Sequence, residues 1–139
     1  MYKHILLAVD GSKNSLRATE EAIKIASLVE QCVVEVLFVI DYSVAKNEVL
    51  HATSKESLDM ERRKKLLPIE EQLKINNLSY QIKILYGEPG PTIVEYANNG
   101  HVELVVIGSR GLNTLQEMVL GSVSHKVAKR VTCPVLIVK

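Results

Sequence analysis

Residues 105–124 read VVIGSRGLNTLQEMVLGSVS, and this stretch decides the fold. Three apolar residues lead directly into Gly108, and nine residues separate Gly111 from the pair Gly121 and Ser122. A glycine at a strand end lets backbone N–H groups approach a ligand closely, and the first N–H groups of a helix attract anions. The spacing therefore predicts a strand, a phosphate-binding turn and a helix, in that order.

Short apolar runs outside this stretch predict the remaining strands. Each run is rich in Ile, Val and Leu, and most are continuous rather than alternating. Continuous runs are typical of parallel strands whose two faces are both covered by helices. The five predicted strands are His4–Val9, Val33–Ile40, Tyr80–Tyr86, Glu103–Ile107 and Pro134–Val138.

Helical patterns fill the intervals between these runs. In the first interval, apolar residues recur every three or four positions from Ala18 to Val29 and make one stripe, with Asp10 and Ser12 ready to cap the helix. Strands that alternate with helices imply right-handed βαβ units. The predicted helices are Ser12–Glu30, about Glu56–Asn76, Gly90–Asn99 and a segment that begins near Ser122.

Four local features refine this pattern. Pro68 removes a backbone donor inside the second helix, so we expect a kink or break there. Gly100 suits the left-handed position that closes the third helix. The charged run Glu61–Lys65 is interpreted as the solvated face of the second helix. Asp41–Lys55 is a long connection after the second strand, typical of a functional or disordered segment, and it could lie over a site.

The elements together predict an α/β protein. We expect a single domain over residues 1–139, built as an open, doubly wound, five-stranded parallel sheet with helices on both faces. Hydrophobic residues make up 47% and charged residues 24%, which is the balance of an ordinary globular protein. The four histidines and two cysteines show no metal-ligand spacing, and all six are interpreted as structural or surface residues.

Charge and composition exclude several partners. Seventeen basic and sixteen acidic residues leave a formal net charge of +1, and the chain has no Trp and one Phe. It lacks both the basic surface that grips DNA and the aromatic platforms on which bases stack, so we expect no nucleic-acid partner. No run approaches the roughly 18 apolar residues of a membrane span, so we expect no membrane partner. The N-terminus lacks a secretory pattern, and the predicted location is the cytoplasm.

The motifs at both ends of the chain resemble those of one known family. The chain contains neither the GK[ST] of a Walker motif nor the GxGxxG of dinucleotide-binding proteins. Instead, ILLAVDGS at 5–12, VVIGSRG at 105–111 and GSVSHKVAKRVTCPVLIVK at 121–139 resemble the ATP-binding subgroup of the universal stress protein family. The resemblance spans the whole chain in element order and is weak from about Asp41 to Leu78.

This resemblance implies an ATP site. Asp10 would lie by the adenosine, and the backbone of Val39 and Ile40 would meet the adenine. The glycine turns would hold ribose and phosphates. Mg²⁺ or Mn²⁺ would be bound through the phosphates, so the protein would supply no metal ligand. The resemblance implies no catalytic residue. The implied contacts are Asp10, Val39, Ile40, Gly108, Arg110, Gly111, Gly121, Ser122, Val123 and Ser124.

The family's strand order, 3-2-1-4-5, agrees with a general rule for such sheets. Ligands lie beyond the carboxyl ends of the strands, at the point where the order reverses. With this order the reversal falls between the first and fourth strands, which end at Asp10 and Gly108. Pro134–Val138 would then be an apolar edge strand. The resemblance implies a homodimer formed by antiparallel pairing of this strand with its mate.

Simpler roles remain open for several of these residues. Asp10 could cap the first helix or shape the Asp-Gly turn, and the glycines of the first turn could serve only that turn. Ser122 could be the N-cap of the last helix. Arg110 and Ser124 point either to phosphate or away from it. His125 stands where the family often has Glu, which removes the carboxylate half of a capping box with Ser122.

The function predicted from these observations is an ATP-binding regulatory module of the stress response, with an unknown regulatory protein partner and at most slow ATP hydrolysis. The chain shows no arranged general base, water-positioning Gln or Walker Lys. The alternative is a universal stress protein that acts through protein contacts without nucleotide. A phosphoacceptor receiver domain would need an Asp where the third strand ends in Tyr86 and Gly87. A nucleotidyl-transferring enzyme would need HIGH-like or SGGxDS-like loops, which the sequence lacks.

Overall fold

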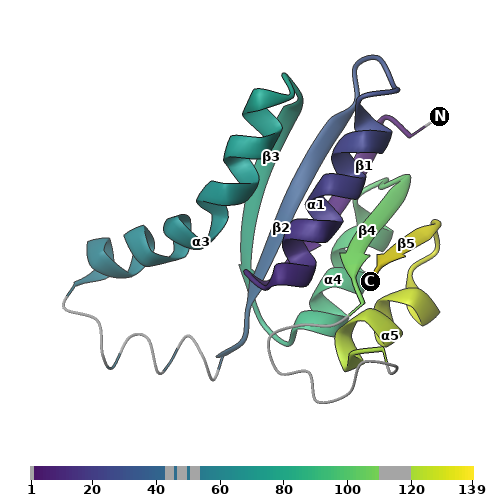
Figure 1. Ribbon diagram of the computed structural model, residues 1–139. Helices are drawn as coiled ribbons and strands as arrows, with labels where there is room; N and C mark the ends of the chain where they lie inside the picture. The colour runs from purple at the N-terminus through teal and green to yellow at the C-terminus, as the bar shows by residue number, and fades with distance from the viewer. Residues whose placement is uncertain (1, 43–45, 47–49, 51–53, 110–119) are drawn as a thin grey trace.

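Figure 1 shows a computed structural model of the chain, which describes residues 2–42, 46, 50, 54–109 and 120–139. Strands and helices alternate along the sequence and build three layers, with helices on both faces of one sheet. The elements are β1 (His4–Val9), α1 (Lys13–Ala26), β2 (Val33–Ile40), α3 (Lys55–Ile75), β3 (Ser79–Tyr86), α4 (Pro89–Asn99), β4 (Leu104–Gly108), α5 (Ser122–Arg130) and β5 (Val135–Val138).

The sheet has five strands in the order β3-β2-β1-β4-β5, and every adjacent pair is parallel. The predicted fold class and strand order are therefore confirmed, and the strand bounds agree with the prediction to within one residue. The order reverses between β1 and β4. All five strands end at the same edge of the sheet, here called the carboxyl edge, which faces down in Figure 1.

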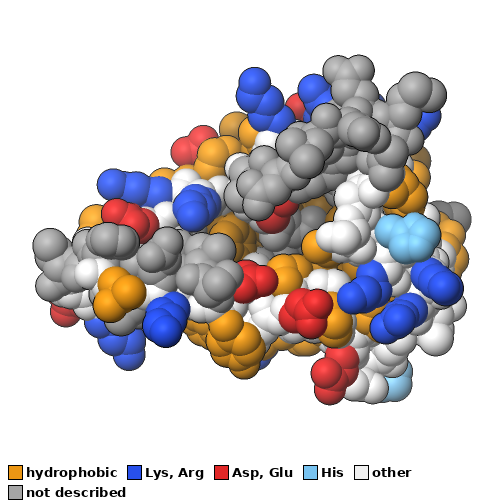
Figure 2. Space-filling view, turned by 90° about the horizontal axis from the view of Figure 1, so that it is seen from below, with side chains coloured by type: hydrophobic (Ala, Val, Ile, Leu, Met, Phe, Trp, Pro, Cys, Tyr) orange, Lys and Arg blue, Asp and Glu red, His pale blue; other side chains and the backbone are white. Residues whose placement is uncertain are grey.

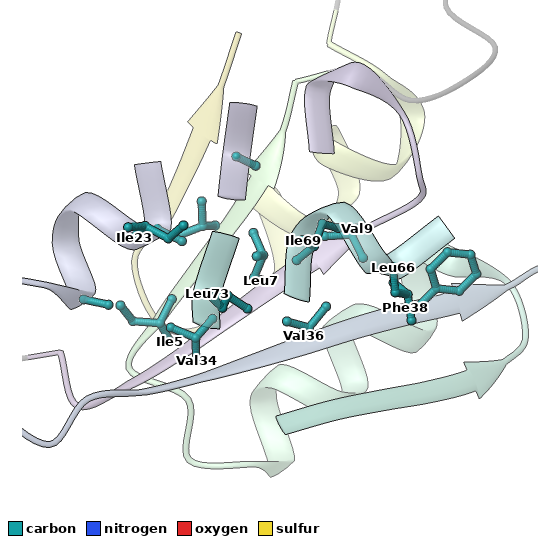
Figure 3. Packing of buried hydrophobic residues seen from close by; sticks show 14 of the residues in the cluster. Ile5, Leu7, Val9, Ile23, Val34, Val36, Phe38, Leu66, Ile69 and Leu73 are labelled. Atoms are coloured by element: carbon teal, nitrogen blue, oxygen red, sulfur yellow. The ribbon is translucent and has the colours of Figure 1, made fainter. Parts of the chain in front are cut away.

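Side chains of β1 alternate between two apolar clusters. Ile5, Leu7 and Val9 pack with α1 and α3, whereas Leu6 and Ala8 pack with α4 and α5. Figure 3 shows the first cluster, in which side chains of α3 lie over β1 and β2. Because helices cover both faces, every position of β1 and β2 after the first is buried, which explains the continuous apolar runs in the sequence.

Helix α3 remains continuous through Pro68, and Figure 1 shows its axis bending partway along. The expected kink is present, but the helix is not broken there. Proline has no N–H to donate to the carbonyl of Lys64, and bending accommodates the loss. The interpretation of Glu61–Lys65 as a solvated face is wrong at Arg62, which is 6% exposed.

Two helix ends differ from the prediction. Helix α1 ends at Ala26, earlier than predicted, and the turn that follows includes Gln31 at a φ of 59°. The prediction that Gly100 takes the left-handed position is wrong, because its φ is −97° and His101 has a φ of 56°. Gly100 is needed for space instead, since a Cβ there would lie 2.9 Å from the carbonyl oxygen of Tyr96.

A buried carboxylate joins β1, β2 and α4 in the amino-terminal half of the sheet. Glu35 of β2 is 9% exposed and lines a pocket of about 450 Å³ together with Tyr96 of α4. Its Oε1 accepts a hydrogen bond from the Tyr96 hydroxyl. Its Oε2 lies 2.8 Å from Nε2 of His4, so this nitrogen carries the proton. The two donors offset the cost of burying the charge.

Tyr96 predicts a dependence of stability on alkaline pH. Burial, and next the hydrogen bond to Glu35, raise the pKa of Tyr96 from 10.0 to about 12. The unfolded chain releases this proton from pH 10 upward while the folded chain retains it, so the free energy of unfolding falls as pH rises from 10 to 12. Urea denaturation should show a shallower fall for Tyr96→Phe than for wild type.

The matched control for this experiment is Tyr42→Phe, because Tyr42 is 69% exposed. This variant should keep the wild-type dependence on pH. If Tyr96→Phe lost stability with pH as steeply as wild type, the hydroxyl of Tyr96 would not be the group responsible.

Candidate functional site

The turn after β1 is organised by Asp10. Its Oδ1 accepts hydrogen bonds from the backbone N–H of Ser12 over 2.9 Å and from the hydroxyl of Ser15 over 2.7 Å. The Ser12 hydroxyl in turn accepts from the backbone N–H of Ser15 over 3.2 Å and caps α1, as predicted. Within the described chain the hydrogen bonds of the Asp10 carboxylate go to Oδ1, so Oδ2 keeps its capacity to accept.

The end of β4 lies directly against the first turn of α1. A Cβ atom on Gly108 would lie 2.8 Å from Cβ of Asn14 and 3.0 Å from its carbonyl carbon and oxygen. A side chain at this position would therefore force Asn14 or the strand to shift. The close contact between β4 and α1 therefore favours glycine at position 108, whether or not the turn binds a ligand.

The backbone of Ser109 joins the two glycine turns. Its N–H donates to the carbonyl of Val138 in β5 over 2.7 Å. Its carbonyl oxygen accepts from the N–H of Gly121 over 2.8 Å and from the hydroxyl of Ser124, also over 2.8 Å. The described ends of the two turns, Gly108–Ser109 and Gly121–Ser122, thus meet beside the reversal between β1 and β4, at the carboxyl edge. This position is compatible with the predicted phosphate-binding turns.

Helix α5 begins at this junction. Gly121 is its N-cap with extended backbone angles, so the alternative in which Ser122 is the N-cap is wrong. The first intrahelical bond runs from the N–H of His125 to the carbonyl of Gly121 over 2.9 Å. The backbone N–H groups of Ser122, Val123 and Ser124 precede that bond and lie outside the helical ladder. Such a helix N-terminus attracts anions.

With Gly121 as the N-cap, Ser124 and His125 occupy other helix positions than predicted. Counted from Gly121, the third helical residue is Ser124, so the Glu that His125 replaces would not have completed a capping box here. Ser124 is 2% exposed, and its hydroxyl lies 2.8 Å from the carbonyl oxygen of Ser109 and 3.0 Å from that of Gly121. The side chain therefore holds the turn together from inside.

The carboxyl end of β2 lies on the opposite side of β1 from this junction. Val39 and Ile40 are both buried there. The carbonyl of Ile40 accepts from the N–H of Gly87 over 3.0 Å, so this acceptor already has a partner. Arg110 and Gly111 lie outside the described residues, as do most of residues 43–53, and the predictions made for them remain predictions.

Comparison with known proteins identifies the family. The whole chain, residues 1–139, matches the model of the universal stress protein family. The chain belongs to the universal stress protein family. The motif resemblance at its two ends is thereby confirmed.

Individual relatives support this assignment over the full length. The chain is 36% identical to universal stress protein YxiE of Bacillus subtilis, in an alignment of 149 residues that covers all of both chains. The solved structure of MJ0577 from Methanocaldococcus jannaschii has a TM-score of 0.86 at 32% identity and covers 100% of this chain and 96% of that one. A universal stress protein crystallised in complex with cAMP has a TM-score of 0.71 at 26% identity and covers 99% and 96%.

Sequence reasoning missed two basic side chains of α3 at the carboxyl edge of this universal stress protein. The guanidinium carbon of Arg62 lies 5.0 Å from the ring centroid of Tyr86, and Arg62 donates a hydrogen bond to the Tyr86 hydroxyl. The methylene stem of Lys65 lies beside Gly11. Arg62 precedes the buried Leu66 by four residues and so continues the apolar stripe of α3. The spacing of Arg62 relative to Leu66 could have predicted that Arg62 is buried.

Other reactive groups of the protein contribute no site in the described residues. Burial raises the pKa of the Cys32 thiol and of the Cys133 thiol, which keeps both protonated and agrees with a structural role. Across residues 2–42, 54–109 and 120–139, no group of three or more His, Cys, Asp or Glu side chains is placed to hold a metal ion. In the same part of the chain no helix is both long enough and apolar enough to cross a membrane.

The contact between Gly108 and α1 predicts a specific cost for one methyl group. Gly108→Ala should lower the free energy of unfolding by about 1–3 kcal/mol, because the new Cβ meets the backbone of Asn14, which cannot move away cheaply. Urea denaturation measures the change.

The matched control is Gly90→Ala in α4. Its new Cβ would lie 2.9 Å from Cδ of Lys126, which is part of a flexible side chain and can move. Alanine also favours the helix, so this variant should be about as stable as wild type. Equal stability of the two variants would contradict the close contact at Gly108.

Proposed function

We propose that this universal stress protein binds ATP at its carboxyl edge and acts in the cytoplasm as a nucleotide-dependent regulatory module of the stress response. Occupancy by ATP would change the surface or the stability of a dimer, and a partner protein would read the change. Mg²⁺ or Mn²⁺ would arrive on the phosphates, without a ligand from the protein.

The observation that carries this proposal is the junction at Ser109. Hydrogen bonds to its carbonyl bring the N-terminus of α5 to the point where the strand order reverses. In doubly wound sheets this is the place where ligands bind, and helix N-terminal N–H groups suit phosphate. The complex of a universal stress protein with cAMP, 26% identical to this chain, supports an adenine nucleotide as the ligand.

Each residue of the proposed site would meet a particular part of the nucleotide. The N–H groups of Ser122, Val123 and Ser124 and the hydroxyl of Ser122 bind phosphate, because they lie at the open end of α5. Asp10 binds the ribose through Oδ2. The remaining contacts come from the backbone of Val39 and Ile40 at the adenine and from Gly108, Arg110, Gly111 and Gly121 along the phosphates.

Hydrolysis by such a site would be slow. The groups assigned to phosphate are backbone N–H groups, a serine hydroxyl and the guanidinium of Arg110, which stabilise charge but do not activate water. Enzymes that transfer phosphoryl groups add a base or a water-positioning residue. The site therefore suits retention of the nucleotide as a signal better than its rapid consumption.

A second candidate is a universal stress protein that acts through protein contacts without nucleotide. Contact with Asn14 explains Gly108 without any ligand, and the hydrogen bond to Ser109 explains the position of Gly121. Nucleotide titration separates this candidate from the first.

The proposal predicts the outcome of calorimetric titration with Mg-ATP. The wild-type protein should bind it below millimolar concentration, and Ser122→Ala should weaken binding by roughly tenfold, because a hydrogen bond to a charged group is lost. Ser27→Ala is the matched control, since Ser27 is an exposed serine at the C-terminus of α1, far along the helix from its capped start. Absence of binding at millimolar Mg-ATP would favour the second candidate.

We also propose that the protein is a homodimer joined by antiparallel pairing of β5 with its mate. β5 is an edge strand paired to β4 alone, and all four of its residues are only partly buried. The carbonyls of Pro134 and Val138 accept bonds from β4, so alternate residues such as Ile137 direct their backbone groups outward. An apolar edge with free backbone groups invites pairing with a second strand.

Light scattering tests this dimer at micromolar concentration. Wild type should have twice the mass of one chain. Ile137→Pro should be a monomer, because it removes an outward N–H without breaking the ladder to β4. Ile137→Val keeps that N–H and should remain a dimer. A monomeric wild type, or a dimeric Ile137→Pro, would show that β5 is not the interface.

A further inference from the structure

We propose that Lys65 of α3 is a phosphate-binding residue of the nucleotide site, reaching the phosphates from beside the turn at Gly11. This inference rests on the proposed ATP function and adds to it a cation from a helix to which the family resemblance assigns no ligand contact. Lys65 would offset the negative charge of the β- and γ-phosphates. It would therefore raise the affinity for ATP but not the affinity for a nucleoside, which has no phosphate.

The position of Lys65 is given by its contact with Gly11. A Cβ atom built on Gly11 would lie 3.8 Å from Cδ of Lys65 and 3.9 Å from its Cβ. The stem of the side chain therefore runs alongside the turn after β1. Since Nζ is two bonds beyond Cδ, the ammonium group lies within reach of the same turn.

A continuous series of contacts leads from this turn to the N-terminus of α5. Gly11 immediately precedes Ser12, the N-cap of α1. Asn14, in the first turn of α1, lies against Gly108 at the end of β4. The next residue, Ser109, accepts the hydrogen bond from Gly121. All of these groups lie along the carboxyl edge, between Lys65 on one side and the open N–H groups of α5 on the other.

Helix α3 is held so that the exposed Lys65 borders its packed face, next to the turn at Gly11. Arg62, one turn earlier, is 6% exposed and is fixed by the ring and hydroxyl of Tyr86 at the end of β3. Residues three apart on a helix share a face, so anchoring Arg62 directs Lys65 toward the same edge. Lys64 lies on the other face, four residues from Met60 and three from Leu67, which are 61% and 46% exposed.

The charges at this edge create a need for such a cation. Asp10 lies in the turn itself, and Asp41 directly follows the end of β2, so two acidic residues lie in the chain at this edge. Figure 2, which looks onto the carboxyl edge, shows Lys and Arg side chains on both flanks, over α3 and over α5, with acidic side chains between them. A helix N-terminus contributes only about half an elementary charge. A lysine at the α3 flank supplies a full one.

Calorimetric titration of Lys65→Ala with Mg-ATP and with adenosine tests the inference. ATP affinity should fall roughly threefold to tenfold, as for loss of a partly exposed charged contact. Adenosine affinity should stay as in wild type, because adenosine has no phosphate for Lys65 to bind. Lys65→Arg should retain most of the ATP affinity. Lys64→Ala, the matched control on the outer face of α3, should bind both ligands as wild type does.

The outcomes separate this inference from the proposed function. If wild type bound neither ligand, the proposed function and the inference would both fail. If wild type bound ATP and Lys65→Ala bound it equally well, the function would stand and Lys65 would not be a ligand. An equal loss for ATP and adenosine would also overturn the inference, because it would mean that the substitution had disturbed the turn. Thermal unfolding of each variant verifies that it is folded before titration.

Discussion

The peptide of Ser109 connects the parts of the molecule on which the candidate site depends. Its N–H extends the ladder between β4 and β5 to Val138, and its carbonyl receives the N–H of Gly121 and the hydroxyl of Ser124. The residue that follows β4 therefore binds the edge strand β5 and positions the helix α5. The direct contact between Gly108 and Asn14 adds α1 to the same assembly. Together with the apolar packing of α5 on the sheet, these bonds fix the N-terminus of α5 relative to β1 and β4.

The fold could be predicted because its signals are local. Continuous apolar runs indicate parallel strands covered on both faces, and the spacing of the glycines indicates where a strand passes into a turn. The order of the strands came from the family resemblance rather than from the residues themselves, since apolar runs do not reveal which strands are neighbours. Pro68 shows that a helix-breaking residue does not by itself end a helix. Helix α3 bends, loses one backbone hydrogen bond and remains packed through its apolar stripe.

Details of the site were less predictable because they depend on contacts between distant residues. Gly121, not Ser122, is the N-cap of α5, and its N–H donates to the carbonyl of Ser109 across the turn. The left-handed position expected at Gly100 is taken by His101, whereas Gly100 leaves room for the carbonyl of Tyr96. The same holds for the buried carboxylate, whose partners His4 and Tyr96 are remote from Glu35 in sequence. Composition alone gives no sign of such pairs.

A site already assembled by its own hydrogen bonds has a consequence for binding. Ser109, Gly121 and Ser124 hold the turn through bonds within the protein, so a ligand does not need to order these groups as it binds. Preorganised groups bind more tightly because less conformational entropy is lost. In the proposed site, the N–H groups outside the helical ladder at the start of α5 would meet the nucleotide from a fixed frame. Selection among ligands would then fall to the proposed contacts around this frame, namely the carboxylate of Asp10 and Lys65 of α3, whose charges would oppose or favour each phosphate.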